Sequence, residues 1–162
     1  MNVRFKFPSG AYKTFQVIDT VKCTPHFTFE ELGNNSSKEA VTLVMDTRFF
    51  KFMECIEAFR TWYGKPMKCN SCYRTEEYNA KVGGDPKSAH LLGCAMDWGI
   101  SGLTDADYLK FSTKWEQICK EAGLIGAINY YTNGLHLEAF SDICYGSKTF
   151  KVRNYRGKKG DW

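Results

Sequence analysis

Residues 93–100 constrain the fold most strongly, because apolar and small side chains alternate along them with a period of two. The apolar set comprises Cys94, Met96, Trp98 and Ile100. Asp97 belongs to the other set, whose remaining members are glycine or alanine. This alternation predicts a β-strand with one packed face and one open face that carries the Asp97 carboxylate. Small neighbours leave room for a ligand at this carboxylate, and a metal ion is our first candidate.

A second strand with a polar face is predicted over residues 135–140. Leucines alternate there with His136 and Glu138, and the preceding pair Asn133-Gly134 is typical of a hairpin turn. Together with His90 and Asp97, His136 completes a set of two imidazoles and one carboxylate. This is the protein ligand set of many catalytic zinc sites, in which the fourth position is left to water. The alternative is that these residues are ordinary surface groups or hydrogen-bonding partners.

The segment 88–97 reads Ser-x-His-x-x-Gly-x-Ala-x-Asp. It resembles the signature of zinc peptidases that cut bacterial cell-wall peptides, namely D-alanyl-D-alanine carboxypeptidases, related dipeptidases and the L-alanyl-D-glutamate endopeptidases of phage endolysins. Residues 71–79 are similar to a Ser-Gly-Tyr-Arg segment of the same family, with Cys72 where glycine is usual. Residues 26–32 resemble its entry segment. The similarity therefore extends from about residue 26 to about residue 140.

The resemblance implies roles for five residues. His90, Asp97 and His136 are expected to bind Zn²⁺, which lowers the pKa of a water molecule and polarises the scissile carbonyl. Arg74 is expected to hold a substrate carboxylate or to stabilise a developing oxyanion. Ser88 is expected to donate a hydrogen bond to the substrate. The implied substrate is a peptidoglycan stem peptide, cut at L-Ala–D-Glu or at D-Ala–D-Ala, and the sequence does not decide between these bonds.

The chain departs from the family pattern at the general base. Relatives often carry Glu or Asp three residues before the last histidine ligand, or another histidine two residues before it. This chain has Asn133 and Gly134 there, and an amide cannot act as a base. Glu138 is a candidate catalytic base, but we favour the interpretation that it supports His136 as a ligand. The remaining alternatives are a carboxylate from elsewhere in the chain, or a weak or inactive peptidase.

We expect a small single-domain α+β fold with an antiparallel sheet and flanking helices, like the hedgehog/D-Ala-D-Ala peptidase superfamily that the resemblance implies. The chain has 162 residues, which is long enough for one core. Residues 1–25 are predicted to form an N-terminal β-hairpin extension and residues 26–145 the zinc peptidase domain. Residues 146–162 are predicted to be a basic C-terminal tail, with a strand near 150–152 and a solvated end. The hairpin is expected to cover an edge of the sheet, and contact with the wall or a partner is the alternative.

Helical periodicity predicts two core helices. Within residues 39–63 apolar side chains recur three or four residues apart, and Gly64 and Pro66 end the pattern. Thr104 and Asp107 resemble a capping box that begins a helix ending near residue 123. Residues 67–73 and 124–131 are predicted strands.

Charge and hydropathy limit the partners. The net charge of +4 favours approach to an anionic wall polymer, but no basic run is interleaved with aromatic residues as a nucleic-acid groove requires. No apolar run is long enough to cross a membrane, and the first residues lack the apolar core of a signal peptide. We therefore expect a monomer that binds a peptidoglycan peptide, without nucleic-acid binding or membrane insertion. It is expected to be made in the cytoplasm, that of the host if phage-encoded, and to act on the wall after release.

Seven cysteines without a secretion signal predict reduced and mostly buried thiols. The pair Cys69-x-x-Cys72 is compatible with a redox site or half of a zinc knuckle, but ordinary residues at a strand end are the better interpretation. The leading functional hypothesis is a zinc-dependent wall peptidase, most similar to phage lysis enzymes. The alternative is a catalytically weak or inactive peptidoglycan-peptide binding protein on the same scaffold, and a redox protein is a third.

Overall fold

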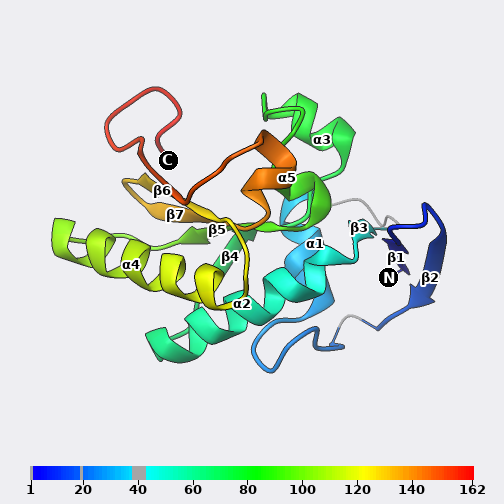
Figure 1. Cartoon of the computed structure of the whole chain (residues 1–162). Helices are drawn as coiled ribbons and strands as arrows, with labels where there is room; N and C mark the ends of the chain where they lie inside the picture. The colour runs from blue at the N-terminus through cyan, green and yellow to red at the C-terminus, as the bar shows by residue number, and fades with distance from the viewer. Residues whose placement is uncertain (1, 19, 38–42) are drawn as a thin grey trace.

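The computed structural model describes residues 2–18, 20–37 and 43–162, which form two β-sheets with surrounding helices (Figure 1). The main sheet has the strand order β4-β5-β7-β6-β8. Its strands are β4 (Lys68–Ser71), β5 (Ala95–Gly99), β6 (Ala127–Tyr131), β7 (Gly134–Glu138) and β8 (Lys151–Asn154). Neighbouring strands are antiparallel except β6 and β8, which run parallel. The predicted α+β class with a largely antiparallel sheet is confirmed.

One row of paired residues crosses the main sheet from edge to edge. In strand order it comprises Ser71, Asp97, His136, Asn129 and Arg153. Residues paired across neighbouring strands project from the same face of a sheet. The register therefore gathers polar side chains from five separate strands on one face.

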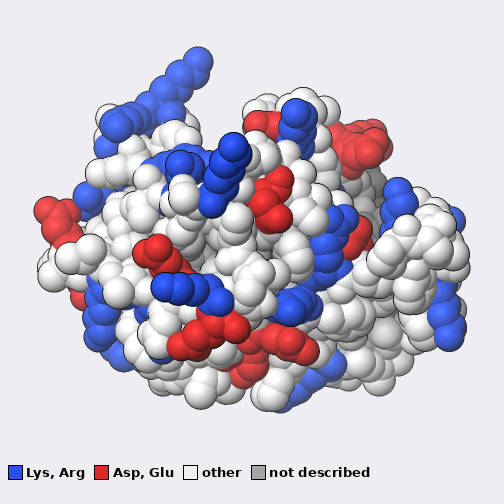
Figure 2. Space-filling model, viewed as in Figure 1, with Lys and Arg blue, Asp and Glu red and all other residues white. Residues whose placement is uncertain are grey.

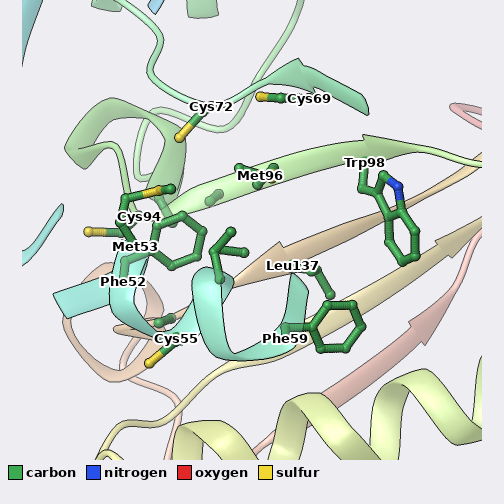
Figure 3. Packing of buried hydrophobic residues seen from close by; sticks show 14 of the residues in the cluster. Phe52, Met53, Cys55, Phe59, Cys69, Cys72, Cys94, Met96, Trp98 and Leu137 are labelled. Carbon is green, nitrogen blue, oxygen red and sulfur yellow. The ribbon is translucent and has the colours of Figure 1, made fainter. Parts of the chain in front are cut away.

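The opposite face of the main sheet forms the hydrophobic core. Met96 and Trp98 are buried on this face, as the alternation along residues 93–100 predicts. Helices α2 (Arg48–Tyr63) and α4 (Asp105–Glu121) cover it. The ring of Phe59 in α2 lies 5.9 Å from that of Trp98 and 5.8 Å from that of Trp115 in α4. Figure 3 shows Phe59 beside the strands that carry Trp98 and Leu137.

Helix α4 begins with the predicted capping box. The Asp107 amide donates to Thr104 Oγ1 over 3.2 Å, and the Thr104 amide donates to Asp107 Oδ2 over 2.8 Å. Trp115 Nε1 donates to the carbonyls of Ala127 and Glu138, each over 3.1 Å. The hydrogen bonds of this indole therefore hold α4 against β6 and β7.

In the described part of the chain, no helix is both long and apolar enough to cross a bilayer.

The predicted helix over residues 39–63 is wrong in its first part. Leu43–Asp46 is strand β3, α2 begins at Arg48, and residues 38–42 lie outside the described residues. Two contacts explain why a strand precedes the helix. Strand β3 pairs with β1, and Asp46 Oδ1 accepts a hydrogen bond from the Arg48 amide over 3.0 Å at the start of α2. The predicted end is confirmed, because Gly64 has a φ of 74° and closes the last turn.

The N-terminal hairpin is confirmed, with strands β1 (Asn2–Lys6) and β2 (Tyr12–Gln16). It does not cover an edge of the main sheet as expected. It joins β3 in a separate sheet of order β2-β1-β3, where β1 and β3 run parallel. Phe5 is the anchor, because its ring lies 4.9 Å from that of Phe50 at the start of α2.

Short helices connect these strands. They are α1 (Phe29–Ser37), α3 (Glu76–Lys81), the 3₁₀ helix η1 (Ala89–Leu92) and α5 (Ser141–Tyr145).

The turn of the hairpin between β6 and β7 is shifted by one residue from its predicted position. Tyr131 pairs with Gly134, so that Thr132 and Asn133 form the turn and Gly134 begins the strand.

The predicted solvated end of the chain is confirmed for residues 157–160, which are exposed, but it is wrong for Trp162. After β8 the chain folds back over the β6–β7 hairpin, as the red segment in Figure 1 shows. The Asn133 amide donates to the Trp162 carbonyl over 2.8 Å, and the Trp162 ring stacks on Tyr131 at 4.9 Å. Gly134 permits this approach, because a Cβ at that position would collide with the indole ring. Aromatic packing therefore holds an end that its charge alone predicted to be solvated.

The Cys69-x-x-Cys72 motif lies in the core. Cys69 belongs to β4, and Cys72 is fully buried beside other apolar side chains (Figure 3). Burial raises the pKa of the Cys72 thiol well above its ordinary value. A thiol kept protonated by burial is a poor nucleophile and a poor metal ligand, which favours the structural interpretation of this motif.

Candidate metal centre

Three polar residues converge on the open face of the main sheet. His90, Asp97 and His136 each offer one ligand atom, and these atoms lie within 4.8 Å of one another. Asp97 Oδ1 lies 2.8 Å from His136 Nδ1 and 3.3 Å from His90 Nε2. All three side chains are buried. The structure thus brings together the three residues that the sequence selects as metal ligands.

The local sequence explains how His90 reaches this face. Ser88 Oγ accepts a hydrogen bond from the His90 amide over 3.3 Å and begins η1. Gly93 ends it with a φ of 65°, a conformation that L side chains rarely adopt. The Cys94 amide then donates to the Ala89 carbonyl over 2.9 Å and leads into β5. The serine and glycine of the motif therefore build the short turn that presents His90 beside Asp97.

Outer hydrogen bonds orient both imidazoles. His90 Nδ1 lies 2.6 Å from the Cys72 carbonyl, and His136 Nε2 lies 2.9 Å from Glu138 Oε2. Ser141 Oγ donates to Glu138 Oε1 over 2.7 Å. The nitrogens that remain, Nε2 of His90 and Nδ1 of His136, both face Asp97. This arrangement fits a metal site, in which a ligating histidine gives its second nitrogen to a carbonyl or carboxylate.

The electrostatics of the cluster also fit a cation. Burial works against ionisation of Asp97, but His90 and His136 outweigh it and hold the Asp97 pKa well below its ordinary value. Burial lowers the pKa of His90. For His136, the hydrogen bonds to Asp97 and Glu138 overcome burial and raise the pKa to about 9. A proton on His136 therefore balances two buried carboxylates, at the position where a metal ion would supply positive charge.

Arg74 lies directly beside this cluster. Its amide donates to the His90 carbonyl over 3.0 Å, just after the end of β4. Its guanidinium donates from Nη2 to Asp97 Oδ2 over 2.6 Å and from Nε to Ser71 Oγ over 3.0 Å. Thr75 follows and caps α3 by accepting from the Tyr78 amide over 3.2 Å. The sharp change from strand to helix fixes the Arg74 backbone next to the metal candidates.

The cluster lies in a cavity of about 520 Å³. Its wall includes all six residues selected from the sequence, which are Arg74, Ser88, His90, Asp97, His136 and Glu138. Asn133, which takes the place of the acid of relatives, is exposed and is not part of the described wall. The only additional acidic side chain that the described residues contribute to the wall is that of Asp85, on the loop before η1.

Sequence reasoning missed the far wall of the cavity. It is built by Asn129, Tyr131, Arg153, Tyr155 and Trp162. Asn129 lies in β6, and the alternation of side chains along this strand could have identified it from the sequence. The three residues after position 150 had no such signal, because their place depends on the parallel pairing of β8 with β6.

A family model described as Peptidase M15 matches residues 25–137, which is more than half of the chain. The matched segment contains His90, Asp97 and His136 and stops before β8. Comparison with curated proteins gives no match. The family match agrees with the motif, and both agree with the cluster of two imidazoles and one carboxylate. The chain belongs to the Peptidase M15 family.

Proposed function

We propose that the protein is a zinc-dependent peptidase that hydrolyses peptide bonds in bacterial peptidoglycan stem peptides. The observation that carries this proposal is the convergence of His90, Asp97 and His136 in an open cavity of a Peptidase M15 member. Phage-type endolysins of this kind cut L-Ala–D-Glu, and carboxypeptidases cut D-Ala–D-Ala. The protein would act as a monomer that reaches the wall after release from the cytoplasm.

The hydrogen bonds of the imidazoles support a specific binding mode. His90 would bind zinc through Nε2 and His136 through Nδ1, because the opposite nitrogens already face Cys72 and Glu138. Asp97 would supply the third ligand. When bound, zinc lowers the pKa of a water molecule and polarises the carbonyl of the substrate.

Two further residues would position the substrate. Arg74 presents a guanidinium to the cavity beside Asp97, where it can stabilise negative charge that develops on a carbonyl oxygen, or hold a carboxylate. Ser88 also lies in the cavity wall and would donate a hydrogen bond from its hydroxyl.

The contacts of the three carboxylates in the cavity favour a different role for each of them. Glu138 is almost wholly buried, and its two oxygens are engaged by His136 and Ser141, so it would hold His136 in place. Asp97 is engaged by Arg74 and both histidines. Asp85 is exposed, and its Oδ1 accepts only from the Lys87 amide among the described residues. We assign the general base to Asp85, which would take the proton of the attacking water and return it to the leaving amine.

The second candidate function is binding of peptidoglycan peptides without hydrolysis. The observation that favours it is Asn133, an exposed turn residue at the position where relatives carry an acid. The two functions differ in one measurable outcome, since only a peptidase changes the mass of the bound peptide.

The test is digestion of purified muropeptides by the zinc-loaded protein, with products weighed by mass spectrometry. A peptidase releases fragments whose masses name the bond, and chelation abolishes their release. A turbidity assay on chloroform-treated Gram-negative cells, with and without chelator, gives the same answer on intact walls. Retention of muropeptides without any fragment would replace the proposed peptidase with the binding protein.

A further inference from the structure

We propose that Arg153 is a specificity-determining residue, whose guanidinium binds a carboxylate of an acidic peptide about three residues from the cleaved bond. This inference rests on the proposed peptidase function and names the substrate class. Arg153 lies in β8, beyond the segment 25–137 that the family model matches. Its contribution therefore belongs to this chain and not to the matched family segment.

The sheet register places Arg153 at a defined distance from the metal candidates. It pairs with Asn129, which pairs with His136, so the three residues share the polar row across the sheet. Neighbouring strands lie about 4.8 Å apart, so β8 lies about 10 Å from β7. An extended peptide advances about 3.3 Å per residue and would span this distance with about three residues.

The guanidinium of Arg153 retains donors for a ligand. Its Nη1 donates to Asn129 Oδ1 over 3.2 Å and lies 3.9 Å from Glu138 Oε1. Among the described residues no other polar contact is made by this side chain, although a guanidinium carries five N–H donors. The side chain is 34% exposed and forms part of the cavity wall.

The charges around the cavity indicate why the ligand is an anion. Its described wall contains two arginines, Arg74 and Arg153. Arg74 is neutralised by Asp97 at 2.6 Å, whereas the acid nearest to Arg153, Glu138, is already engaged by His136 and Ser141. Arg153 is therefore the wall arginine that has no hydrogen-bonded acidic partner in the described chain, since its one ion pair is the longer contact of 3.9 Å with Glu138. A carboxylate matches its forked donors best, because both oxygens can be bound at once.

The segment that carries Arg153 is held in place before any substrate arrives. Arg156 Nη1 lies 2.7 Å from Asp105 Oδ1 at the start of α4. The Thr132 amide donates to Asp161 Oδ1 over 2.6 Å, and Tyr155 stacks on Tyr131 at 5.5 Å. Lysine and arginine side chains gather over this segment in Figure 2, which favours approach of an anionic peptide. A fixed wall loses little entropy on binding and can therefore discriminate between ligands.

The test compares stem peptides that differ in a single carboxylate, each carboxylate being replaced in turn by its amide. The zinc-loaded wild type is expected to cleave one acidic peptide with kcat/KM about 10- to 100-fold above its amide. Arg153→Met should lose this preference and retain its rate on the amide, and Arg153→Lys should restore part of it. Lys151→Met is the matched control, since Lys151 lies two residues away on the same strand, is exposed and stays outside the described cavity wall.

Two outcomes would overturn the inference: an active wild type indifferent to every amidation, or an Arg153→Met variant with unchanged preference and a native circular dichroism spectrum. A wild type that cleaves none of the peptides would refute the proposed peptidase function instead. Calorimetric titration of the same peptides then decides about Arg153. Tighter binding of one acidic peptide, lost in Arg153→Met, supports the role, and equal affinities reject it.

Discussion

The guanidinium of Arg74 lies 2.6 Å from Oδ2 of Asp97, while Oδ1 of the same carboxylate faces the two histidines. One side chain therefore joins the candidate metal ligands to the candidate substrate-binding group. We therefore expect substitutions around Asp97 to separate metal binding from turnover.

Asp97→Asn is expected to abolish zinc binding. The amide keeps the shape of the side chain but removes the charge that a divalent ion requires in this buried site. Elemental analysis of purified protein should give about one zinc per wild-type chain and almost none for the variant. Asp142→Asn, at an exposed position of α5, is the control and should bind zinc normally.

Glu138→Gln is expected to weaken zinc binding about 10- to 100-fold, because Glu138 orients His136 from behind. Ser141→Ala, which removes the hydrogen bond to Glu138, should produce a smaller loss in the same direction. Competition with a chromophoric chelator measures both affinities. Full zinc affinity with a lost rate in Glu138→Gln would identify Glu138 as the general base, and would remove that role from Asp85.

Arg74→Ala is expected to lower kcat/KM about 10²- to 10³-fold while zinc remains bound. In the proposed mechanism the guanidinium stabilises charge that develops in the reaction, whereas the three ligand atoms remain in the variant. Steady-state cleavage of a muropeptide and zinc analysis of the same sample provide the two readouts. Arg60→Ala, in α2 on the opposite face of the sheet, serves as the control. Unchanged turnover in Arg74→Ala would exclude this residue from catalysis.

The C-terminal segment is expected to detach at low pH. Hydrogen bonds from Thr132, and from the Gly157 amide, lower the pKa of Asp161 to about 2. The folded-state pKa lies below the ordinary value of 3.8, so the contribution of Asp161 is complete above about pH 4 and is lost as the pH falls through 2. Asp161→Asn should mimic this loss at neutral pH.

Limited trypsin digestion provides the measurement at neutral pH. Cleavage after Lys158 or Lys159, both exposed, should become faster in Asp161→Asn than in the wild type. Indole fluorescence followed between pH 5 and pH 2 should report the release of Trp162 from Tyr131 in the wild type. Equal digestion rates would show that Asp161 does not hold the segment.

Trp115→Phe is expected to reduce the free energy of unfolding by about 2 kcal/mol. The substitution removes the indole N–H that donates to the Ala127 and Glu138 carbonyls, and it leaves space in the core. Urea unfolding followed by circular dichroism gives the difference. Trp62→Phe, at a half-buried position of α2, should change stability much less.

Local patterns were sufficient to predict the floor of the site. The alternation around Asp97 determines which face of β5 is polar, and the turn residues before it determine how His90 enters. The capping box at Thr104 fixes the start of α4 in the same local way. Such local patterns predict these features reliably, because the hydrogen bonds and the apolar–polar alternation involve residues only a few positions apart in the sequence.

Tertiary pairing decided the remaining features. Leu43–Asp46 became a strand because β1 lies beside it, although the surrounding periodicity is helical. Arg153 and Trp162 reached the cavity because β8 pairs with β6 and the end of the chain stacks on Tyr131. The sequence by itself therefore determined the candidate metal ligands and the strands that carry Asp97 and His136. The far wall was decided only in three dimensions, since contacts between distant segments leave no periodic trace in the residues that make them.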